Sequence, residues 1–430
     1  MQIKNLKFKI IIPALFVLAI ALGLLQRDPN QYTVNNQSAN VKLSGETQNE
    51  LWNFYNKAKE LAPEKKEQKS TATFLAVGDI MLSRNVAAES FKALDVELPF
   101  RKMKDILLST DFNFGNLESP FFAASHPCSV GSGNMEGIVG GHSLIFGAPC
   151  NMRQGLKDFN FKILSLANNH ALDQGVDGLE GTNALLDDLG IQHIGTGKNM
   201  AEAWRPAITN ANGIKICFVG ASYASANDGG KSTNDYVARI EDLENLKLQI
   251  KNSKSLCDFV VASIHAGTEY TTKPNQDQKD FAHAAINFGA DMVIGHHPHW
   301  VQTIERYCPH PLLTSPLKGE ESAVPLPRGE GQGEGDAGLG CSNPKYIFYS
   351  LGNFIFDQMW SQETREGLTL KIQISKNRES TLQGPRTPAN VDSIELIPVI
   401  IDNYSTPRPA NETETKKILE KIGQTGRLLK

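Results

Sequence analysis

The chain has 430 residues, of which 40% are hydrophobic and 21% are charged, and its formal net charge at pH 7 is −4. This composition is ordinary for a globular protein, and the length allows one large core or two smaller ones, so an intrinsically disordered protein is excluded. Because basic residues are not in excess, nucleic acid is not an expected partner.

The amino terminus has the composition of a membrane-targeting segment. Lysines precede an uncharged run over residues 10–25, and Arg27 closes this run. The run is short for a full span of roughly 20 residues, but Ala19-Ile20-Ala21 makes a poor cleavage site because the residues behind it stay apolar. We therefore expect residues 1–27 to be an uncleaved signal-anchor of a single-pass protein of the cell membrane, with everything after it outside the cytoplasm. A cleaved signal, which would give a secreted protein, is the alternative.

The segment after the anchor differs in composition from the rest of the chain. Residues 28–70 are rich in Gln, Asn, Ser and Lys, so we expect a flexible stalk that holds a globular domain off the membrane. The globular domain is expected over residues 71–405, and a closing helical segment over residues 406–430. Within the domain, residues 309–341 are rich in Pro, Gly and Glu and are expected to form a disordered insertion, because they cannot bury enough apolar surface to become ordered.

The six cysteines can pair if the chain is exported as expected. Two pairs bracket irregular loops and suit loop-closing bridges, namely Cys128 with Cys150 and Cys308 with Cys341. Cys217 and Cys257 lie at the starts of apolar strands, where we expect small buried thiols.

Apolar strands alternate with amphipathic helices along the globular domain. The expected strands cover residues 72–77, 112–114, 162–166, 192–194, 215–219, 259–264, 291–294, 345–351, 368–374 and 394–401. The expected helices cover residues 151–159, 178–189, 241–253, 276–288 and 412–429, and residues 99–109 form an amphipathic stretch. Alternation at this spacing predicts a layered α/β architecture in which helices cover the sheets.

Polar side chains follow several of these strands at their carboxyl ends. They are Asp79, Asn116, the pair Asn169-His170, His265, and the cluster His296-His297-Pro298-His299. In open α/β sheets, ligands and metals bind outside the carboxyl ends of the strands. Taken singly, each residue also has a structural interpretation as a turn, a cap or a satisfied core histidine. Their shared placement favours a metal or phosphate-type site.

The chemistry of these side chains narrows the choice of metal. Carboxylate, carboxamide and imidazole ligands form a mixed nitrogen and oxygen set that suits Mn, Fe or Zn, and the lack of cysteine among them argues against a structural zinc finger. A metal held in this way polarises a phosphoryl oxygen or lowers the pKa of bound water, and a free imidazole such as His170 can protonate a leaving group.

Six motifs, in order along the chain, resemble the CapA/PgsA family of bacterial capsule synthesis, or poly-γ-glutamate synthesis, proteins. They are residues 78–82, 115–120, 166–175, 265–270, 295–299 and 350–358. The resemblance covers residues 73–358 and implies a calcineurin-like metallophosphoesterase fold, a four-layer α/β/β/α sandwich, on an outward-facing anchored protein. It also implies a role in making or exporting poly-γ-glutamate or a related anionic capsule polymer, with integral-membrane synthase components as partners.

The resemblance implies roles for single residues as well. His170 would be the catalytic general acid, and one or two divalent ions of Mn, Fe or Zn are expected. The implied metal ligands are Asp79, Asn116, Glu118, Asn169, His265, His297 and His299. The expected substrate-binding residues are Glu269, Tyr270, His296, Asn353 and Asp357.

The motifs depart from the superfamily pattern at two positions. Met81 stands where the first motif, Asp-x-His, has its histidine, and Asn116 stands where the second motif has its bridging aspartate, a role that Glu118 could take. The superfamily's Gly-His-x-His pattern fits only with a shift of one residue, so His296 and His297 compete for one role. The number of ions therefore stays open between one and two.

Three functions are compatible with the sequence. The first is an anchored component of capsule polymer synthesis, the second is a secreted metal-dependent phosphoesterase, and the third is a non-catalytic polymer-binding module. The anchor and the stalk favour the first, because a nutrient-scavenging hydrolase has less need of a fixed position. Whether the protein is an enzyme stays open, with a metal-dependent hydrolase as the enzymatic alternative.

Overall fold

The computed structural model describes residues 69–122, 144–225, 235–309, 341, 343–377 and 387–429. The expected anchor lies outside the described residues, and so does nearly all of the expected stalk and of the expected insertion. Within the described ranges, no helix is both long and apolar enough to cross a membrane.

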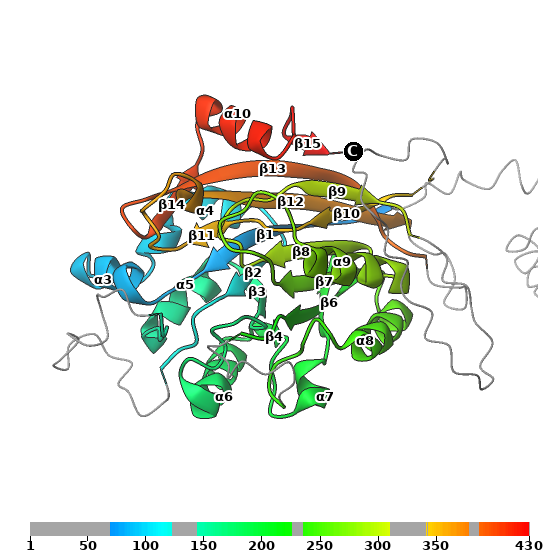
Figure 1. Cartoon of the computed structure of the whole chain (residues 1–430), viewed down its shortest axis with the longest axis horizontal. Coiled ribbons are helices and arrows are strands. Elements are labelled where there is room, and N and C mark those ends of the chain that lie inside the picture. Colours follow the sequence, from blue (N-terminus) through cyan, green and yellow to red (C-terminus); the bar gives the residue numbers. More distant parts are fainter. Residues whose placement is uncertain are drawn as a thin grey trace, which may run out of the picture. The chain divides into compact units, whose positions relative to one another are not determined.

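Two β-sheets form the centre of the described chain (Figure 1). The first sheet has the strand order β14-β13-β12-β1-β2-β3-β4, with β11 paired to β1 and β15 paired to β13. Its strands are β1 (Lys69–Ile80), β2 (Phe112–Leu117), β3 (Phe161–Ser165), β4 (Gln192–Ile194), β11 (Asn353–Ile355), β12 (Glu366–Asn377), β13 (Asn390–Asp402), β14 (Thr406–Pro409) and β15 (Leu428–Leu429).

The second sheet has the strand order β5-β6-β7-β8-β10-β9. Its strands are β5 (Ala207–Ala211), β6 (Ile214–Ser222), β7 (Phe259–His265), β8 (Met292–His296), β9 (Ile304–Tyr307) and β10 (Lys345–Phe348). The α-helices are α3 (Arg84–Lys92), α4 (Lys104–Leu107), α5 (Arg153–Asp158), α6 (Gly175–Asp187), α7 (Met200–Ala203), α8 (Leu243–Leu256), α9 (Gln276–Phe288) and α10 (Glu412–Lys421). Short 3-10 helices are η2 (Leu98–Met103), η3 (Cys150–Met152) and η4 (Glu363–Arg365).

The two sheets face each other across an aromatic core. Phe74 of β1 stacks on Phe112 of β2 with ring centroids 5.1 Å apart, and Phe218 of β6 meets Phe74 edge-on at 6.0 Å. All three rings are buried in one apolar cluster with strands of both sheets. Aromatic rings contribute large buried areas in such layers, so this contact holds the two sheets together.

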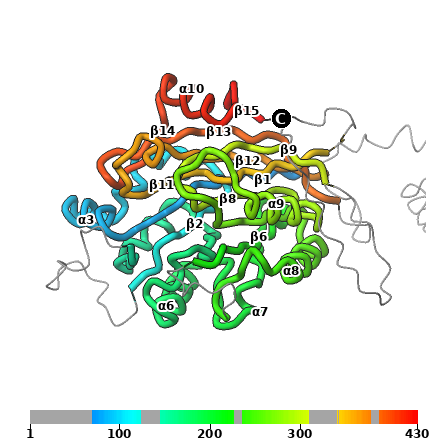
Figure 2. The backbone as a smooth tube through the Cα atoms, in the orientation of Figure 1, coloured from blue at the N-terminus to red at the C-terminus, as the bar shows by residue number. Residues whose placement is uncertain are grey.

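Helices cover the outer face of each sheet. Phe100 of η2 packs against Phe161 of β3 on the first sheet, with ring centroids 6.1 Å apart. Ile250 of α8 and Phe281 of α9 share an apolar cluster with β6 and β7 of the second sheet. In Figure 1, α8 and α9 lie next to that sheet, and Figure 2 traces the same path. The layers are therefore helix, sheet, sheet and helix, which confirms the predicted α/β architecture.

Parallel pairing brings the carboxyl ends of the central strands to the same edge. In the first sheet Asp79 pairs with Asn116, and Asn353 of β11 pairs with Asp79 from the other side. In the second sheet His265 pairs with His296. These strands are buried on both faces, which is why they read as continuous apolar runs that end in a polar residue.

Two glycines allow the backbone to come close at this edge. A Cβ atom on Gly78 would lie 2.0 Å from the carbonyl oxygen of Gly352, and one on Gly295 would lie 2.1 Å from that of Tyr349. No side chain fits at either position, so glycine at 78 lets β1 place Asp79 at the site, and glycine at 295 lets β8 approach the backbone of Tyr349.

The carboxyl-terminal segment differs from its prediction. The predicted helix over residues 412–429 is correct only as far as Lys421. Gly423 adopts a φ of +73°, the left-handed conformation that favours glycine after a helix, and the chain then returns as β15 to pair with β13. Residues Thr406–Pro409 form β14 and not part of a helical segment.

Cys217 and Cys257 were expected as buried thiols, and that prediction is wrong because they form a disulfide. Cys217 lies in β6, and Cys257 lies just after α8 and shortly before the start of β7, the parallel neighbour of β6. A sequence separation of 40 residues gives no sign that the two strands are adjacent.

The loop-closing bridges agree with the prediction where the structure describes both cysteines. Cys308 and Cys341 are disulfide-bonded at the base of the insertion. Cys150 is also disulfide-bonded, and Cys128, its expected partner, lies outside the described residues.

Candidate metal centre

Asp79 lies near the end of β1 and is fully buried. Its Oδ1 accepts a hydrogen bond from the Asn116 amide at 2.8 Å, and its Oδ2 accepts one from the backbone N–H of His297 at 3.3 Å. Burial raises the pKa of Asp79 to about 7, although these hydrogen bonds favour the charged form. The carboxylate is thus oriented by neutral donors, and a cation would favour its ionised form.

Glu118 directly follows β2 and is also fully buried. Neither of its carboxylate oxygens has a hydrogen-bond partner in the part of the chain that the structure describes. Burial, followed by the charge of the neighbouring Asp79, raises the pKa of Glu118 well above its ordinary value. A buried carboxylate without a partner is costly, so this position calls for a cation or a shared proton.

His299 completes a group of three possible ligands. One ligand atom from each of Asp79, Glu118 and His299 can be chosen so that all lie within 4.8 Å of one another. The His299 Nδ1 is 3.6 Å from Asp79 Oδ2, and its Nε2 is 3.8 Å from Glu118 Oε1. Burial lowers the pKa of His299 to about 4, so the ring is neutral and able to ligate a metal. We call these three residues the acidic cluster.

Asn353 orients the imidazole of His299. Its Oδ1 lies 2.9 Å from His299 Nδ1, and because an amide oxygen only accepts, Nδ1 carries the proton. The Nε2 lone pair is then left on the side of Glu118. Asn353 was expected to bind substrate, but the structure places it behind a candidate ligand, where it fixes the tautomer.

His170 faces the acidic cluster and is held by two neighbours. Its Nδ1 lies 2.7 Å from Asp173 Oδ2, a carboxylate oxygen that accepts a hydrogen bond from Nδ1–H. The ring stacks on Phe146 with centroids 3.9 Å apart, and the Phe146 N–H donates to the same Asp173 oxygen at 2.6 Å. The His170 Nε2 is 3.9 Å from Glu118 Oε1. This arrangement suits the proton-transfer role expected of His170.

A second set of polar residues lies beside the acidic cluster and is joined by hydrogen bonds. The Asn116 amide nitrogen is 3.1 Å from His265 Nδ1, and the His265 Nε2 is 2.7 Å from Asn169 Oδ1. Asn168 donates to the Asn116 Oδ1 at 3.2 Å. Burial, and then the neighbouring His297, lower the pKa of His265 well below its ordinary value, so its ring is neutral.

The adjacent histidines His296 and His297 point in different directions. The His296 Nε2 donates to the backbone carbonyl of Val77 at 3.1 Å, so this ring binds β1 and does not face the acidic cluster. His297 adopts a φ of +101° and places its ring 4.8 Å from that of His265 and 4.6 Å from that of Tyr223. Of the two, His297 is the one that the structure brings to the site.

The expected substrate-binding residues Glu269 and Tyr270 lie at the rim. Glu269 is exposed, and the Tyr270 ring lies 6.0 Å from that of His299. Burial and the charge of Glu269 raise the pKa of Tyr270 to about 12, so its hydroxyl stays protonated. Trp360, which the sequence analysis did not single out, is 61% exposed and packs edge-on against Tyr270 at 4.8 Å.

Asp357 is not available to a substrate, because its carboxylate pairs with Arg84 and accepts from the backbone and side chain of Asn85 at 3.2 and 3.0 Å. Arg84 was missed by sequence reasoning. Its guanidinium lies 4.8 Å from the centroid of Phe146, the ring that stacks on His170, and its charge favours ionised Glu118. The only sign of its role in the sequence is its position just after the first motif. This sign is weak, because an arginine at the start of a helix is ordinarily a surface residue.

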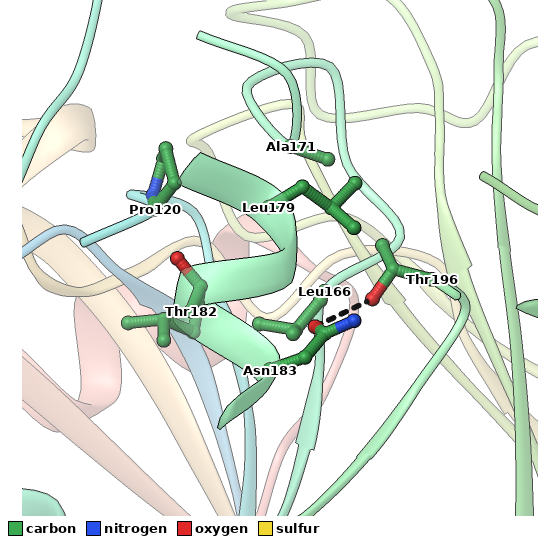
Figure 3. Close-up of a pocket in the computed structure, with 8 residues that line it drawn as sticks. Pro120, Leu166, Ala171, Leu179, Thr182, Asn183 and Thr196 are labelled. Atoms are coloured by element: carbon green, nitrogen blue, oxygen red, sulfur yellow. Dashed lines mark hydrogen bonds between the residues drawn. The ribbon is translucent and has the colours of Figure 1, made fainter. Parts of the chain in front are cut away.

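A small cavity beside α6 is separate from these residues (Figure 3). Its volume is about 10 Å³, and Leu166, Leu179 and Thr196 are among the residues that line it. Figure 3 shows the hydrogen bond between Thr196 and Asn183, which measures 3.2 Å. Such a volume holds about one water molecule, so this cavity is not a substrate site.

The chain is similar to proteins of known family. A model described as "Bacterial capsule synthesis protein PGA_cap" matches residues 73–358. The "PGA biosynthesis protein CapA" of Bacillus subtilis (strain 168) is 27% identical over 334 residues, which cover 76% of this chain and 73% of that protein. The "Capsule biosynthesis protein CapA" of Bacillus anthracis is 26% identical over 329 residues, which cover 75% of this chain and 68% of that protein. Among solved structures, a putative 5'-nucleotidase from Staphylococcus aureus matches at a TM-score of 0.42 with 12% identity, covering 82% of this chain and 58% of that one.

Proposed function

The chain belongs to the bacterial capsule synthesis protein family, and from this membership we propose that it takes part in making an anionic capsule polymer, poly-γ-glutamate or a related one. Relatives named for PGA and capsule biosynthesis support this polymer class. We propose further that its activity depends on a divalent cation, Mn, Fe or Zn, held by Asp79, Glu118 and His299.

The observation that carries the metal proposal is the environment of Glu118. Its carboxylate is fully buried and accepts no hydrogen bond from an N–H or hydroxyl group among the described residues, and the carboxyl of Asp79 lies beside it, so its compensation falls to a proton shared with Asp79 or to a cation. Two buried carboxylates and a neutral imidazole match the ligand preferences of Mn, Fe and Zn. Ligand atoms within 4.8 Å of one another fit around a single ion.

The residues around the acidic cluster suit a reaction at an extended substrate. When bound, the cation supplies Lewis-acid chemistry, which polarises an oxygen of the substrate or lowers the pKa of water. His170, with its Nδ1–H held by Asp173, exposes Nε2 for proton transfer on the same side. Tyr270 and Trp360 offer an aromatic surface at the rim on which a chain-like substrate can rest.

A metal-dependent phosphoesterase is the second candidate function. The orientation of His170 toward the acidic cluster favours it, because phosphoester cleavage benefits from a proton donor next to a Lewis acid. The four-layer architecture is that expected of the calcineurin-like metallophosphoesterases. Incubation of the metal-loaded chain with phosphate monoesters, phosphate diesters and γ-glutamyl oligomers distinguishes the two: release of phosphate alone would favour this second function.

We propose that the domain works outside the cytoplasm on a membrane anchor, next to integral-membrane synthase components. The uncharged run over residues 10–25 and the bridges Cys217–Cys257 and Cys308–Cys341 support this location, since disulfides persist in oxidising compartments. Protease added to intact spheroplasts should digest the domain while a cytoplasmic marker survives. Protection of the domain until the membrane is broken would contradict the proposal.

Complementation tests the polymer function. A strain that lacks this gene should regain its capsule polymer with the wild-type chain and with Glu244→Gln, a control that removes an exposed carboxylate on α8. Glu118→Gln and His170→Ala should reduce cell-bound polymer at least tenfold at equal protein level. Full polymer yield with both variants would exclude a catalytic or metal-dependent role for the site.

A further inference from the structure

Asn116 joins the two halves of the site through its amide group. One half is the acidic cluster, and the other is the set of amides and imidazoles beside it, which includes His265 and Asn169. An ionised carboxylate such as that of Asp79 can only accept hydrogen bonds, so the donating amide nitrogen of Asn116 faces it. The distance from Asn116 Nδ2 to Asp79 Oδ1 is 2.8 Å. The same nitrogen is 3.1 Å from His265 Nδ1, and the Asn116 oxygen accepts from Asn168. The orientation of the amide is therefore fixed by all of its neighbours together.

The orientation of the Asn116 amide determines the tautomer of His265. Because Nδ1 accepts from the amide of Asn116, the proton of the neutral ring lies on Nε2, which donates to Asn169 Oδ1 at 2.7 Å. Both ring nitrogens of His265 and the side-chain oxygen of Asn169 are thus used within the protein. In contrast, Glu118 on the other side of the site has no such bond to any described residue.

The charges of the two halves differ in the same way. The acidic cluster offers two carboxyls, whereas the Asn116 side offers amides and neutral imidazoles. His297 has a buried Nδ1 that meets no partner among the described residues, but one neutral imidazole cannot hold a divalent ion by itself. The residue between the halves is an amide, which supplies no charge to bridge two ions.

We propose that the site holds one divalent cation, at Asp79, Glu118 and His299, and that Asn116 closes the neighbouring position by tying His265 to the acidic cluster. This inference rests on the proposed metal centre. In this arrangement Asn116 acts by positioning its neighbours and not as a metal ligand. The tautomer of His265 follows from the orientation of the Asn116 amide. The same arrangement also explains why the expected ligands Asn169 and His265 are hydrogen-bonded to each other.

The stoichiometry of bound metal tests the proposal. The full chain, purified in detergent, stripped with a chelator and reloaded with Mn²⁺, should retain one Mn²⁺ per chain, with the electron paramagnetic resonance spectrum of an isolated ion. His265→Gln should also retain one. Two ions per chain in the wild type, or a loss of metal in His265→Gln, would overturn the one-ion site but leave the metal-dependent function standing. No metal in the wild type would overturn the metal centre itself.

A gain of metal tests the role of Asn116 directly. Asn116→Asp places a third carboxylate between the acidic cluster and His265, so the reloaded variant should bind a second Mn²⁺ and show exchange coupling between the two ions. Asn168→Asp, which changes a neighbour in the same network, should stay at one ion. A folded Asn116→Asp variant with one ion would contradict the proposal. If circular dichroism shows that this variant is unfolded, the wild-type and His265→Gln stoichiometries still decide the number of ions.

Discussion

Asp79 and Glu118 dominate the electrostatics of the site at the scale of single residues. Both are fully buried, and both have pKa values raised chiefly by burial. Neutral hydrogen-bond donors orient Asp79, whereas Glu118 has none in the described chain. Metal-free protein must therefore either carry two buried negative charges here, with Arg84 as the nearby cation, or keep a proton, and each choice has a measurable consequence.

The pH dependence of stability reports the proton on Asp79. The pKa of this group rises from 3.8 in the unfolded chain to about 7 in the folded one, so between these values the folded state binds more protons. The stability that comes from the protonated Asp79 carboxyl is fully present below about pH 4. It is lost as the pH rises through about 7, because the folded state then has to give up this proton. Thermal unfolding of the metal-free chain should show a larger drop in Tm between about pH 5 and pH 8 for the wild type than for Asp79→Asn. Equal drops would show that Asp79 is not the group responsible, and added Mn²⁺ should restore the wild-type Tm at the higher pH.

Arg84 and Asp357 form an ion pair that is largely shielded from solvent, with side-chain exposures of 14% and 2%. Removing one partner of such a pair leaves the other charge without compensation. Arg84→Met should lower the free energy of unfolding by about 3 kcal/mol, measured by urea denaturation. The double variant Arg84→Met with Asp357→Leu should be destabilised by less than the sum of the single variants. Additive effects would show that the pair does not couple energetically.

At the scale of elements, the site depends on how closely β1 approaches the segment that leads into β11. Gly78 precedes Asp79 in β1, and a side chain here would collide with the backbone of Gly352. Because neither backbone can give way without moving its strand, the position of Asp79 is set by this contact. The sequence reveals the glycine but not its neighbour, since residues 78 and 352 are distant along the chain.

Gly78→Ala should therefore displace Asp79 and abolish metal retention, with a loss of stability of a few kcal/mol expected from overpacking of the backbone. Gly426→Ala is the matched control, because a Cβ there meets no atom within 4 Å. Metal content and the midpoint of urea denaturation measure both effects. Wild-type metal content in Gly78→Ala would mean that β1 tolerates the shift and that the close approach does not position the site.

At the scale of the whole described chain, two sheets bring together polar residues from segments far apart in sequence. Alternating apolar runs were enough to predict the α/β layers and the strand ends that carry Asp79, Asn116, His265 and His299. Pairing between distant strands was not predictable, because strand order leaves no local pattern. This is why the disulfide between Cys217 and Cys257 was missed.

The roles of several polar residues were hidden for a similar reason. Asn353 and Asp357 lie in a motif that indicates a site, but only the three-dimensional contacts separate a residue that faces the acidic cluster from one that orients a candidate ligand. His296 and His297 are adjacent in sequence and turn toward different partners. Composition and spacing predict which polar residues lie at the strand ends. The role of each of these residues follows only from its packing contacts.

Elemental analysis of the purified full chain tests the central claim most directly, namely that a buried acidic cluster in a capsule synthesis protein holds a divalent cation. Wild-type protein and Glu118→Gln would be purified without chelator, with folding checked by circular dichroism. The structure predicts Mn, Fe or Zn in the wild type and a loss of at least tenfold in Glu118→Gln. A wild-type chain without metal, even after reconstitution, or a variant that retains the metal in full, would contradict it.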